Sequence, residues 1–230
     1  MKEHGLGFKA PMVRAILAGT KTQTRRGVLG ASGAFWDHAA WRPVLSPDGS
    51  GIVEWATDGG TAPGPQPKAP HGPVGRRLWV RETWAEVDPD YREMVGGKPY
   101  VYRADYDPPA KGDYGMWCRR GSDPPIYWNG KWKPAIHMPR DAARITLEVT
   151  RVRVERLQDI SVEDIAAEGV TREAVRELLP LSWLASSDLY QEFQEAGPRD
   201  LWRIGWTSIN GFNSWRKNPW VWVYDFRRLG

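Results

Sequence analysis

Alternation of apolar and polar residues is clearest in the third quarter of the chain, from Arg144 to Leu157. In this segment, RITLEVTRVRVERL, alternate residues are apolar on each side of Thr150-Arg151, where the pattern slips. Period-two alternation predicts a β-strand, and the slip predicts a bulge or bend. Three further segments alternate well enough to be predicted strands: Arg77–Ala85, Tyr100–Ala104 and Trp220–Arg228.

Helical spacing occurs in shorter segments. Pro11 and Gly19 suit the first turn and the end of a helix, and the residues between them recur at helical spacing. Ser161 and Asp164 form the pattern of a capping box, and Gly169 is a typical helix terminator. The predicted helices are therefore Ala10–Gly19, Ser161–Glu168, one that opens at Thr171, and Leu189–Glu195.

These elements indicate an α+β or mainly β fold. Strands that surround short helices, without regular strand–helix–strand alternation, are typical of a barrel. No repeat or linker divides the sequence, so we expect a single domain over residues 1–230. Two Gly- and Pro-rich stretches, residues 27–76 and 107–135, are expected to be long and largely irregular insertions. Extra helical sequence is expected between residues 171 and 209.

Composition narrows the setting of the protein but not its activity. The 230 residues carry a net charge of +4, a mildly basic balance that permits polyanion binding without requiring it. The first residues lack the apolar stretch of a secretory signal, and the apolar runs are too short for a membrane helix. With one cysteine, Cys118, no internal disulfide can form. We therefore expect a cytoplasmic protein without membrane contact.

Tryptophan is unusually frequent, with fourteen residues. Aromatic faces beside cations suit stacked bases and phosphates. The alternative is ordinary packing in the core and at its rim, where aromatic side chains dominate. The tryptophans that have a cation nearby in sequence are Trp41 (Arg42), Trp79 (Arg77 and Arg81), Trp117 (Arg119), Trp132 (Lys131 and Lys133) and Trp215 (Arg216).

Five stretches of the sequence, taken in order, resemble the ASCH domain family. The first, ILAGTKTQTRR (Ile16–Arg26), is similar to the family signature of a helix end, Gly, Lys-Thr-x-Thr and Arg. The others are LWVRETWA, KPAIHMPRDAARITLEV, LQDISVEDIAAEG (Leu157–Gly169) and NPWVWVYDFRRL. Together they cover roughly half of the chain and resemble a longer branch of the family that phages and prophages often carry.

The resemblance implies a PUA-like β-barrel with short flanking helices and a cleft that faces the Lys-Thr-x-Thr turn. We expect about six strands, closed by residues 144–157 and 220–228, with the helix 10–19 beside the mouth. Family members are proposed RNA binders, and a small bacterial member hydrolyses the acetyl amide of N4-acetylcytidine. Its catalytic lysine and threonine match Lys21 and Thr24, and its glutamate best matches Glu168.

The chemistry of these three residues agrees with that activity. Amide hydrolysis needs a nucleophile, a proton shuttle and a donor to the developing oxyanion. Lysine can attack or deprotonate when burial or a neighbouring cation lowers its pKa, and Arg25 and Arg26 lie close to Lys21 in sequence. Thr24 is suited to donate to the carbonyl oxygen, and Glu168 to pass protons. Alternatively, Lys21 contacts a phosphate, Thr24 caps a turn and Glu168 is solvated.

Further residues are candidates for substrate binding. The two arginines would contact phosphate, and Glu82 would accept from the amino group of a base, although a strand glutamate is often simply solvated. His137 has a structural alternative, and Asn210 and Trp220 belong to a turn that either stacks a base or closes the barrel. The full set of candidates is Arg25, Arg26, Glu82, Trp84, His137, Asn210 and Trp220.

No cofactor is predicted. The sequence contains neither GxGxxG nor GxxxxGK[ST], so ATP and dinucleotides are not indicated. Its four histidines and its cysteine lie far apart, which disfavours a zinc cluster. Nothing beside Cys118 marks that residue as a nucleophile.

Two functions of different class follow. The first is a hydrolase of a modified nucleobase or nucleoside, with an N4-acylated cytosine or cytidine as the expected substrate. The second is a non-enzymatic reader of RNA or of a modified base, with cations on phosphate and tryptophans on the base. Ribonuclease activity, proposed for some family members, is a third hypothesis. A closed pocket around Lys21, Thr24 and Glu168 would favour the enzyme, and a basic groove with exposed tryptophans would favour the reader.

Overall fold

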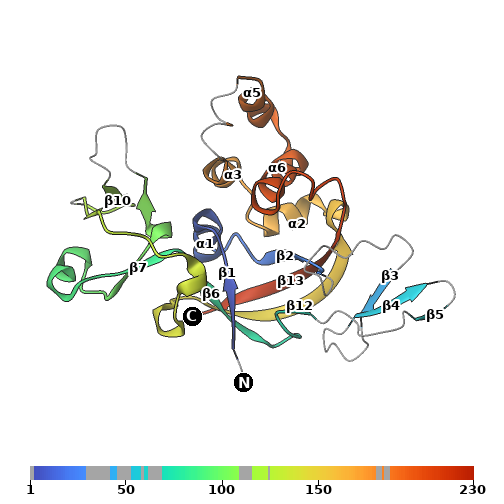
Figure 1. Cartoon of the computed structure of the whole chain (residues 1–230), viewed down its shortest axis with the longest axis horizontal. Coiled ribbons are helices and arrows are strands. Elements are labelled where there is room, and N and C mark those ends of the chain that lie inside the picture. Colours follow the sequence, from blue (N-terminus) through green and yellow to red (C-terminus); the bar gives the residue numbers. More distant parts are fainter. Residues whose placement is uncertain are drawn as a thin grey trace.

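The structure is a computed structural model, which describes residues 3–29, 42–45, 53–57, 60–61, 69–108, 116–123, 125–179, 183 and 187–230. Its main element is a five-stranded sheet in the order β1-β6-β12-β13-β2. This sheet crosses the lower part of the molecule, and the helices lie above it (Figure 1). Its strands are β1 (His4–Gly7), β2 (Gln23–Gly27), β6 (Arg77–Arg81), β12 (Thr146–Arg156) and β13 (Trp220–Leu229).

The long antiparallel pair of β12 and β13 forms the centre of this sheet. The register of the pair shifts between Val149 and Arg151, so the predicted bulge is confirmed, and so is the predicted terminal strand. One face of the pair packs with β1, β6 and helix α1 (Ala10–Leu17) to form the main core. The fully buried residues of this core include Val13, Leu78, Leu147, Val149 and Tyr224.

The sheet is open, so the predicted closed barrel is wrong for the described strands, although the coarser α+β class holds. β1 and β2 are its two edges, and no backbone ladder joins them within the described residues. A side chain bridges the edges instead, because Arg26 of β2 donates from Nη2 to the carbonyl oxygen of Gly7 at 2.8 Å.

Besides α1, the described residues form helices α2 (Val162–Ala167), α3 (Arg172–Leu178), α5 (Ser187–Glu195) and α6 (Pro198–Asn210). Ser161 caps α2 and Thr171 caps α3, each through a side-chain oxygen that accepts a backbone N–H at 3.1 Å. Both predicted helix starts and the predicted helix Leu189–Glu195 are confirmed. A membrane span would need a longer and more apolar helix than any in the described part of the chain.

The helical sequence expected between 171 and 209 includes most of helix α6 (Pro198–Asn210). The helix starts at Pro198, where the missing backbone N–H removes no helical hydrogen bond. Trp202 and Trp206 on its buried side pack with Val221 and Val223 of β13. This packing places α6 above the sheet, with α2 and α3 beside it (Figure 1).

The chain between β6 and β12 forms an arm of short strands, at the left of Figure 1. The first pair is β7 (Trp84–Glu86) with β8 (Tyr100–Tyr102). A three-stranded sheet follows, in the order β11-β10-β9. Its strands are β9 (Tyr106–Asp107), β10 (Trp117–Arg119) and β11 (Tyr127–Trp128). Short 3-10 helices occur in this part of the chain at Pro89–Tyr91, Glu93–Val95, Arg103–Asp105, Ala135–His137 and Arg140–Ala142. One more, Leu157–Asp159, follows β12.

Two sequence predictions are corrected in this arm. The predicted strand Arg77–Ala85 is interrupted at Glu82 and Thr83, because β6 and β7 belong to different sheets. The stretch 107–135, predicted to be a loop, contains strands in its described part. Tyr106 and the tryptophans at 117, 128 and 132 pack together there, so aromatic burial orders a segment rich in Gly and Pro.

The insertion predicted at 27–76 is also not wholly irregular. Its described part contains a three-stranded sheet of β3 (Arg42–Leu45), β4 (Val53–Thr57) and β5 (Gly60–Thr61). The expectation of irregular structure is therefore wrong for these residues. The positions 30–41, 46–52, 58–59 and 62–68 lie outside the described residues.

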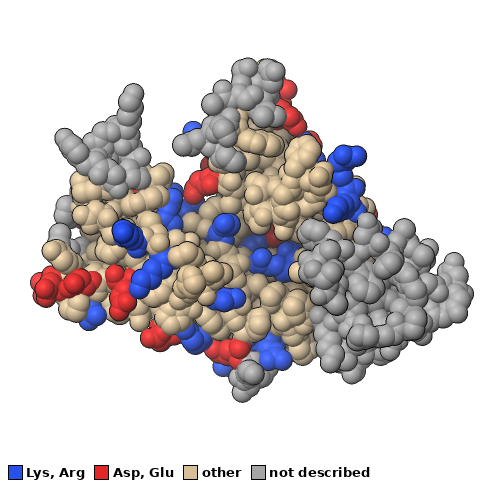
Figure 2. All heavy atoms as spheres, in the orientation of Figure 1, with Lys and Arg blue, Asp and Glu red and all other residues tan. Residues whose placement is uncertain are grey.

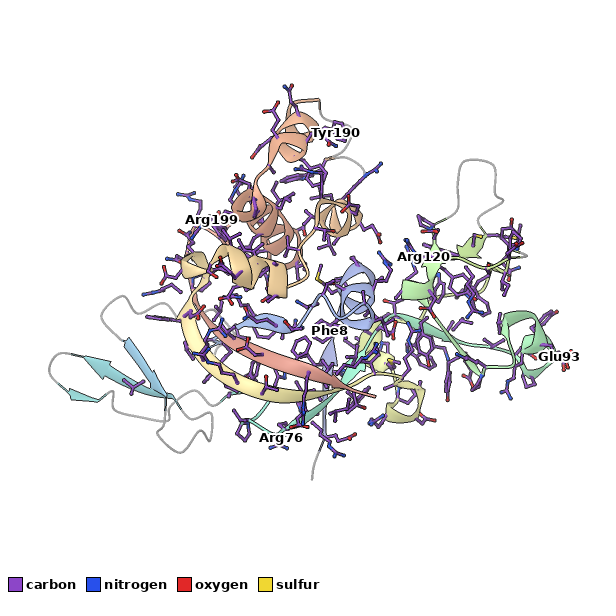
Figure 3. The ribbon with its side chains drawn as sticks, turned by 180° about the vertical axis from the view of Figure 1, so that it is seen from behind. Phe8, Arg76, Glu93, Arg120, Tyr190 and Arg199 are labelled. Atoms are coloured by element: carbon purple, nitrogen blue, oxygen red, sulfur yellow. The ribbon has the colours of Figure 1, made fainter. Side chains whose placement is uncertain are left out.

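The arm, α1 and α3 meet around one carboxylate, that of Glu177 in α3. Arg14 of α1 donates to Glu177, and Arg120 of the arm lies 3.5 Å from the same carboxylate. In Figure 3, Arg120 lies on the side of the arm that faces the helices, and Phe8 lies at the centre, between α1 and the sheet. These ion pairs link the arm to the helices.

Gly169 lets the end of α2 lie against α1 and Lys21. Its φ of 70° is in the left-handed region, and an added Cβ would lie 2.8 Å from the Cβ of Ala15 and 2.9 Å from the Cβ of Lys21. Gly19, after α1, has a φ of 77°, but an added Cβ there would meet no atom within 4 Å. The two glycines therefore share one backbone requirement and differ in packing.

We predict that Gly169→Ala lowers the free energy of unfolding by about 3 kcal/mol or more, and that Gly19→Ala lowers it by about 1 kcal/mol. The left-handed strain is common to both variants, whereas only the first adds steric overlap. Urea unfolding followed by tryptophan fluorescence measures both values. Equal losses in the two variants would contradict the tight packing of α2 against α1.

Candidate active site

A cavity of about 410 Å³ opens beside the edge strand β2. Figure 2 shows Lys and Arg side chains at the bottom of a hollow between two raised parts of the surface. A mostly apolar lining with a few converging polar groups is typical of small-molecule sites. One wall is polar and contains Lys21, Thr24, Arg25, Arg26 and Glu168. The apolar wall comes from α3 and α6 and contains Val175, Leu178, Trp202, Gly205, Trp206 and Ile209.

Lys21 and Glu168 form a buried ion pair in the polar wall. Lys21 Nζ donates to Glu168 Oε2 at 2.6 Å and to the backbone carbonyl of Glu168 at 2.7 Å. The two side chains are 2% and 4% exposed. The backbone brings them together, since the two residues form a β-bridge and Thr22 N donates to Ala167 O at 2.8 Å. Main-chain contacts therefore set the position of this pair.

The surroundings of Lys21 lower the pKa of its ammonium group. Burial lowers the pKa of the Lys21 ammonium below the ordinary lysine value, and the charges of Arg26 and Arg25 lower it further. The charge of Glu168 and its hydrogen bond raise this pKa, but the net direction is downward. Both causes expected from the sequence act here, and burial is the larger. A neutral amine is thus easier to reach at Lys21 than at an exposed lysine.

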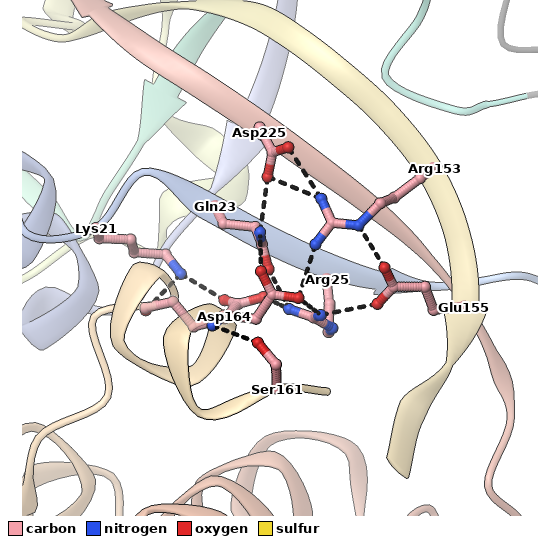
Figure 4. Close-up of polar contacts among 9 residues, drawn as sticks. Lys21, Gln23, Arg25, Arg153, Glu155, Ser161, Asp164 and Asp225 are labelled. Atoms are coloured by element: carbon pink, nitrogen blue, oxygen red, sulfur yellow. Dashed lines mark hydrogen bonds and ion pairs between the residues drawn. The ribbon is translucent and has the colours of Figure 1, made fainter. Parts of the chain in front are cut away.

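Arg25 pairs with three carboxylates, and Figure 4 labels two of their residues, Asp164 and Glu155. The side chain of Arg25 is fully buried and lies 3.5 Å from Glu168 Oε1. It also pairs with Asp164 at 2.8 Å and with Glu155 at 2.9 Å. Gln23 accepts from Arg25 and donates to Asp164 at 2.9 Å. The expected phosphate contact of Arg25 is therefore replaced by contacts with carboxylates of the protein itself.

Arg153 of β12 completes this network. Its guanidinium donates to Asp225 at 2.9 and 3.0 Å, to Asp164 at 2.8 Å, and to Glu155. Burial alone would raise the pKa of Asp164, but hydrogen bonds from Gln23 and the two arginines outweigh burial and lower it. Asp164 therefore stays ionised at neutral pH and anchors both arginines.

Thr24 and Arg26 lie on the opposite face of β2 from Arg25, as strand alternation requires. Thr24 is buried, pairs with Tyr224 of β13 and lines the cavity. The guanidinium of Arg26 lies 5.1 Å from the ring centroid of Phe8, and Lys21 Nζ lies 5.9 Å from the same centroid. Phe8 thus contacts both cations. The three catalytic candidates and both arginines border one cavity.

Asn210 is the remaining predicted binding residue that borders the cavity. It ends α6, and its Nδ2 donates to the backbone carbonyl of Trp206 at 3.1 Å. The other four, Glu82, Trp84, His137 and Trp220, do not line it, so the structure does not bring them together with the three catalytic candidates.

Glu82 and Trp84 instead support the junction between the sheet and the arm. Arg144 donates to the two carboxylate oxygens of Glu82 at 2.9 and 3.0 Å. Burial raises the pKa of Glu82, and Arg144 opposes that change. Trp84 is buried, with Lys133 Nζ 4.8 Å from its ring centroid. Thr83, between the two, does line the cavity, because neighbouring residues of an extended chain point to opposite sides.

His137 and Trp220 lie near the site without facing it. His137 is exposed at the end of a 3-10 helix whose first two residues, Ala135 and Ile136, line the cavity. Trp220 begins β13, and the guanidinium of Arg156 lies 4.3 Å from its ring centroid. This contact is a packing role, one of the two alternatives that its turn suggested.

The described tryptophans pack against other residues and are not exposed at the surface. None of those whose side chains are described is exposed. Arg81 does lie 5.7 Å from its sequence neighbour Trp79, but Trp117 receives the distant Arg103 at 3.8 Å from its ring centroid. Trp41 lies outside the described residues. Clusters of Trp and cations in the sequence therefore indicate burial here more than an open binding surface.

Sequence reasoning missed the apolar wall. Trp202 and Trp206 line the cavity with their ring centroids 5.6 Å apart, and Arg25 lies 6.0 Å from the Trp202 centroid. The segment PRDLWRIGW carried a signal for the helix, namely a proline followed by apolar residues at helical spacing. Nothing local in that segment indicates that the helix lies over β2.

The polar groups at the cavity are suited to organic ligands. Ammonium, guanidinium, hydroxyl and amide groups bind carbonyl oxygens, phosphates or base edges. Metal sites instead gather carboxylates, imidazoles or thiolates. Among the described residues, no group of three or more His, Cys, Asp or Glu side chains is placed to hold a metal ion.

The function of the chain is inferred from the residues of the cavity, because comparison with known proteins gives no match. Lys21 and Glu168 in contact, with Thr24 beside the same space, are the features that any assignment must explain. The chain matches no protein-family profile, and no characterised protein or solved structure is significantly similar to it.

Proposed function

We propose that the chain is an ASCH-type hydrolase that cleaves the amide of an N4-acylated cytosine or cytidine. The observation that carries the proposal is the convergence of Lys21, Thr24 and Glu168 on one cavity. Lys21 lies between α1 and β2, Thr24 lies in β2 and Glu168 is the C-cap residue of α2. An amine of lowered pKa, a hydroxyl and a carboxylate are the groups that amide hydrolysis needs.

In this mechanism, Lys21 is the general base toward water. An ammonium has three donor positions, and Glu168 accepts at two of them, so within the described residues one position on Nζ remains for water or substrate. Neutral Lys21 takes a proton from the attacking water as the new C–O bond forms. The Thr24 hydroxyl donates to the carbonyl oxygen as negative charge develops there.

The leaving amine needs a proton as the C–N bond breaks. Glu168 Oε2 lies 2.6 Å from Lys21 Nζ and relays the proton from Lys21 to the N4 nitrogen of the base. The products are the carboxylic acid and the free amino group of cytosine. Arg25, fixed by its own carboxylate partners, keeps Glu168 oriented for the transfer.

A reader without catalysis would use the same cavity, but two observations favour hydrolysis. Lys21 and Arg25 are buried and contact carboxylates of the protein itself, whereas a phosphate-binding surface presents its cations to solvent. In addition, no described tryptophan is exposed for stacking on a base. A panel of modified nucleosides and short RNAs, incubated with the protein and analysed by mass, separates the hypotheses by product.

The proposal includes a PUA-like relationship for the sheet. Three features of the chain support it: the Lys-Thr-x-Thr turn leads from α1 into β2, β12 leads into the capped helix α2, and β13 pairs with both β12 and β2. A cytoplasmic location and a single functional unit over residues 1–230 belong to the same proposal.

The first prediction concerns Lys21→Arg, which keeps the positive charge but cannot supply a neutral amine. We expect hydrolysis of N4-acetylcytidine to fall by a factor of about 100 or more, the usual contribution of a general base. Nucleoside binding is expected to persist. Product formation by mass analysis and binding by calorimetry measure the two effects.

Lys98→Arg, the same substitution at an exposed lysine away from the cavity, is the matched control and should keep full activity. Because Lys21 is buried, Glu168→Gln provides a second variant of unchanged size that removes the proton relay. Thermal melting confirms that each variant is folded. Full hydrolysis by folded Lys21→Arg would overturn the catalytic assignment.

The second prediction concerns the pH dependence of hydrolysis. The rate should rise with pH as Lys21 loses its proton, and should level off below the range of an ordinary lysine, because burial and Arg26 lower the pKa of Lys21. Arg26→Gln removes one positive neighbour, so the pKa of Lys21 increases and the rise in rate moves to higher pH. Arg216→Gln, at an exposed loop residue, should leave the profile in place. An unchanged or acid-shifted profile in Arg26→Gln would contradict the role of Arg26.

A further inference from the structure

The outer edge of β2 presents backbone groups to the cavity. Val28 N donates to Trp220 O at 2.9 Å, and β2 and β13 pair in regular antiparallel register from Gln23 to Gly27. In such a ladder, the N–H and C=O groups of alternate residues face the partner strand. The groups of Val28 face β13, so those of Arg25 and Gly27 point away from it. Both residues line the cavity.

The outer edge of β1 faces the same space. Phe8 N donates to Arg81 O at 2.9 Å, so the backbone groups of Phe8 face β6. Those of the adjacent residue, Gly7, therefore point away from β6. Gly7 O accepts from Arg26 of β2 at 2.8 Å, as an outward-facing group would. Gly7 also lines the cavity. Among the described strands, neither of these two edges has a ladder partner, and the Arg26 side chain joins them where a closed barrel would continue its ladder.

The residue types on these edges leave room for a flat ligand. Gly7 and Gly27 carry no side chain at the space between the strands. A Cβ added at Gly7 would meet no atom within 4 Å, so the protein leaves the position beside it open. Trp202 and Trp206, both buried, form part of the helical wall of the same cavity.

We propose that the space between β1 and β2 is a slot for one planar heterocycle that presents a hydrogen-bond acceptor next to a donor. The backbone N–H and C=O groups of Arg25 and Gly27 complement such an edge, as found at N3 and N4 of cytosine. The ring takes the place of the missing strand pairing and closes the sheet. The inference rests on the base-binding part of the proposed function but does not require hydrolysis.

The first test compares two nucleosides that differ at one ring atom. Calorimetry on the wild-type chain measures the affinity of cytidine and of 3-deazacytidine, in which C–H replaces the N3 acceptor. We expect 3-deazacytidine to bind about ten-fold more weakly or worse, because a buried backbone donor loses its partner. Equal affinities, or no binding of cytidine at millimolar concentration, would overturn the slot.

The second test fills the slot from the protein side. Gly7→Val places its side chain in open space, so the variant should melt like the wild type yet bind cytidine at least about ten-fold more weakly. Gly197→Ala, at an exposed glycine whose added Cβ also meets no atom within 4 Å, is the control and should bind normally. Wild-type affinity in Gly7→Val would reject the proposal.

The two proposals fail in different ways. If cytidine binds with the expected dependence on N3 but N4-acetylcytidine is not cleaved, the slot holds and the hydrolase is wrong. If N4-acetylcytidine is cleaved but 3-deazacytidine binds as well as cytidine, the hydrolase holds and the slot is wrong.

Discussion

The buried contact between Lys21 and Glu168 is the constraint on which the rest of the site depends. Moving two charges out of water costs several kcal/mol for each ion, and only close geometry with further hydrogen bonds offsets that cost. Here the backbone supplies the geometry, through the bridge between the two residues and the close packing at Gly169. Arg25 also pairs with Glu168, and Asp164 in turn pairs with Arg25. Lys21 and Arg25 thus each have a carboxylate partner, whereas Arg26, which also lines the cavity, donates to the backbone carbonyl of Gly7.

The local parts of this structure could be read from the sequence. The caps at Ser161 and Thr171 and the bulge after Val149 are each determined by a few neighbouring residues, and all three are present. The turn that carries Lys21 and Thr24 is equally local, so the sequence placed these two residues beside each other. Short-range signals of this kind need no knowledge of the fold.

The parts that depend on distant contacts could not be read in this way. Glu82 looked open to ligand because its partner Arg144 is 62 residues away. The sequence left the tryptophans as either a binding surface or core packing, because their contacts with the arm and the helices are a tertiary property. The barrel was expected to close by strand pairing, whereas the side chain of Arg26 joins the two edges. In each case, contacts between residues far apart in the sequence decided what the local pattern could not.

The strand order also has a consequence for how the protein is made. β1 and β2 are synthesised first, yet β2 pairs with β13, the last described strand, and Gln23 contacts Asp225 across 202 residues. Contacts of such sequence separation form late, after the loop between them has closed. A nascent chain on the ribosome therefore carries Lys21 and Thr24 long before it has any cavity around them. The cavity is therefore complete only after β13 has emerged and docked, when most of the described chain has already been made.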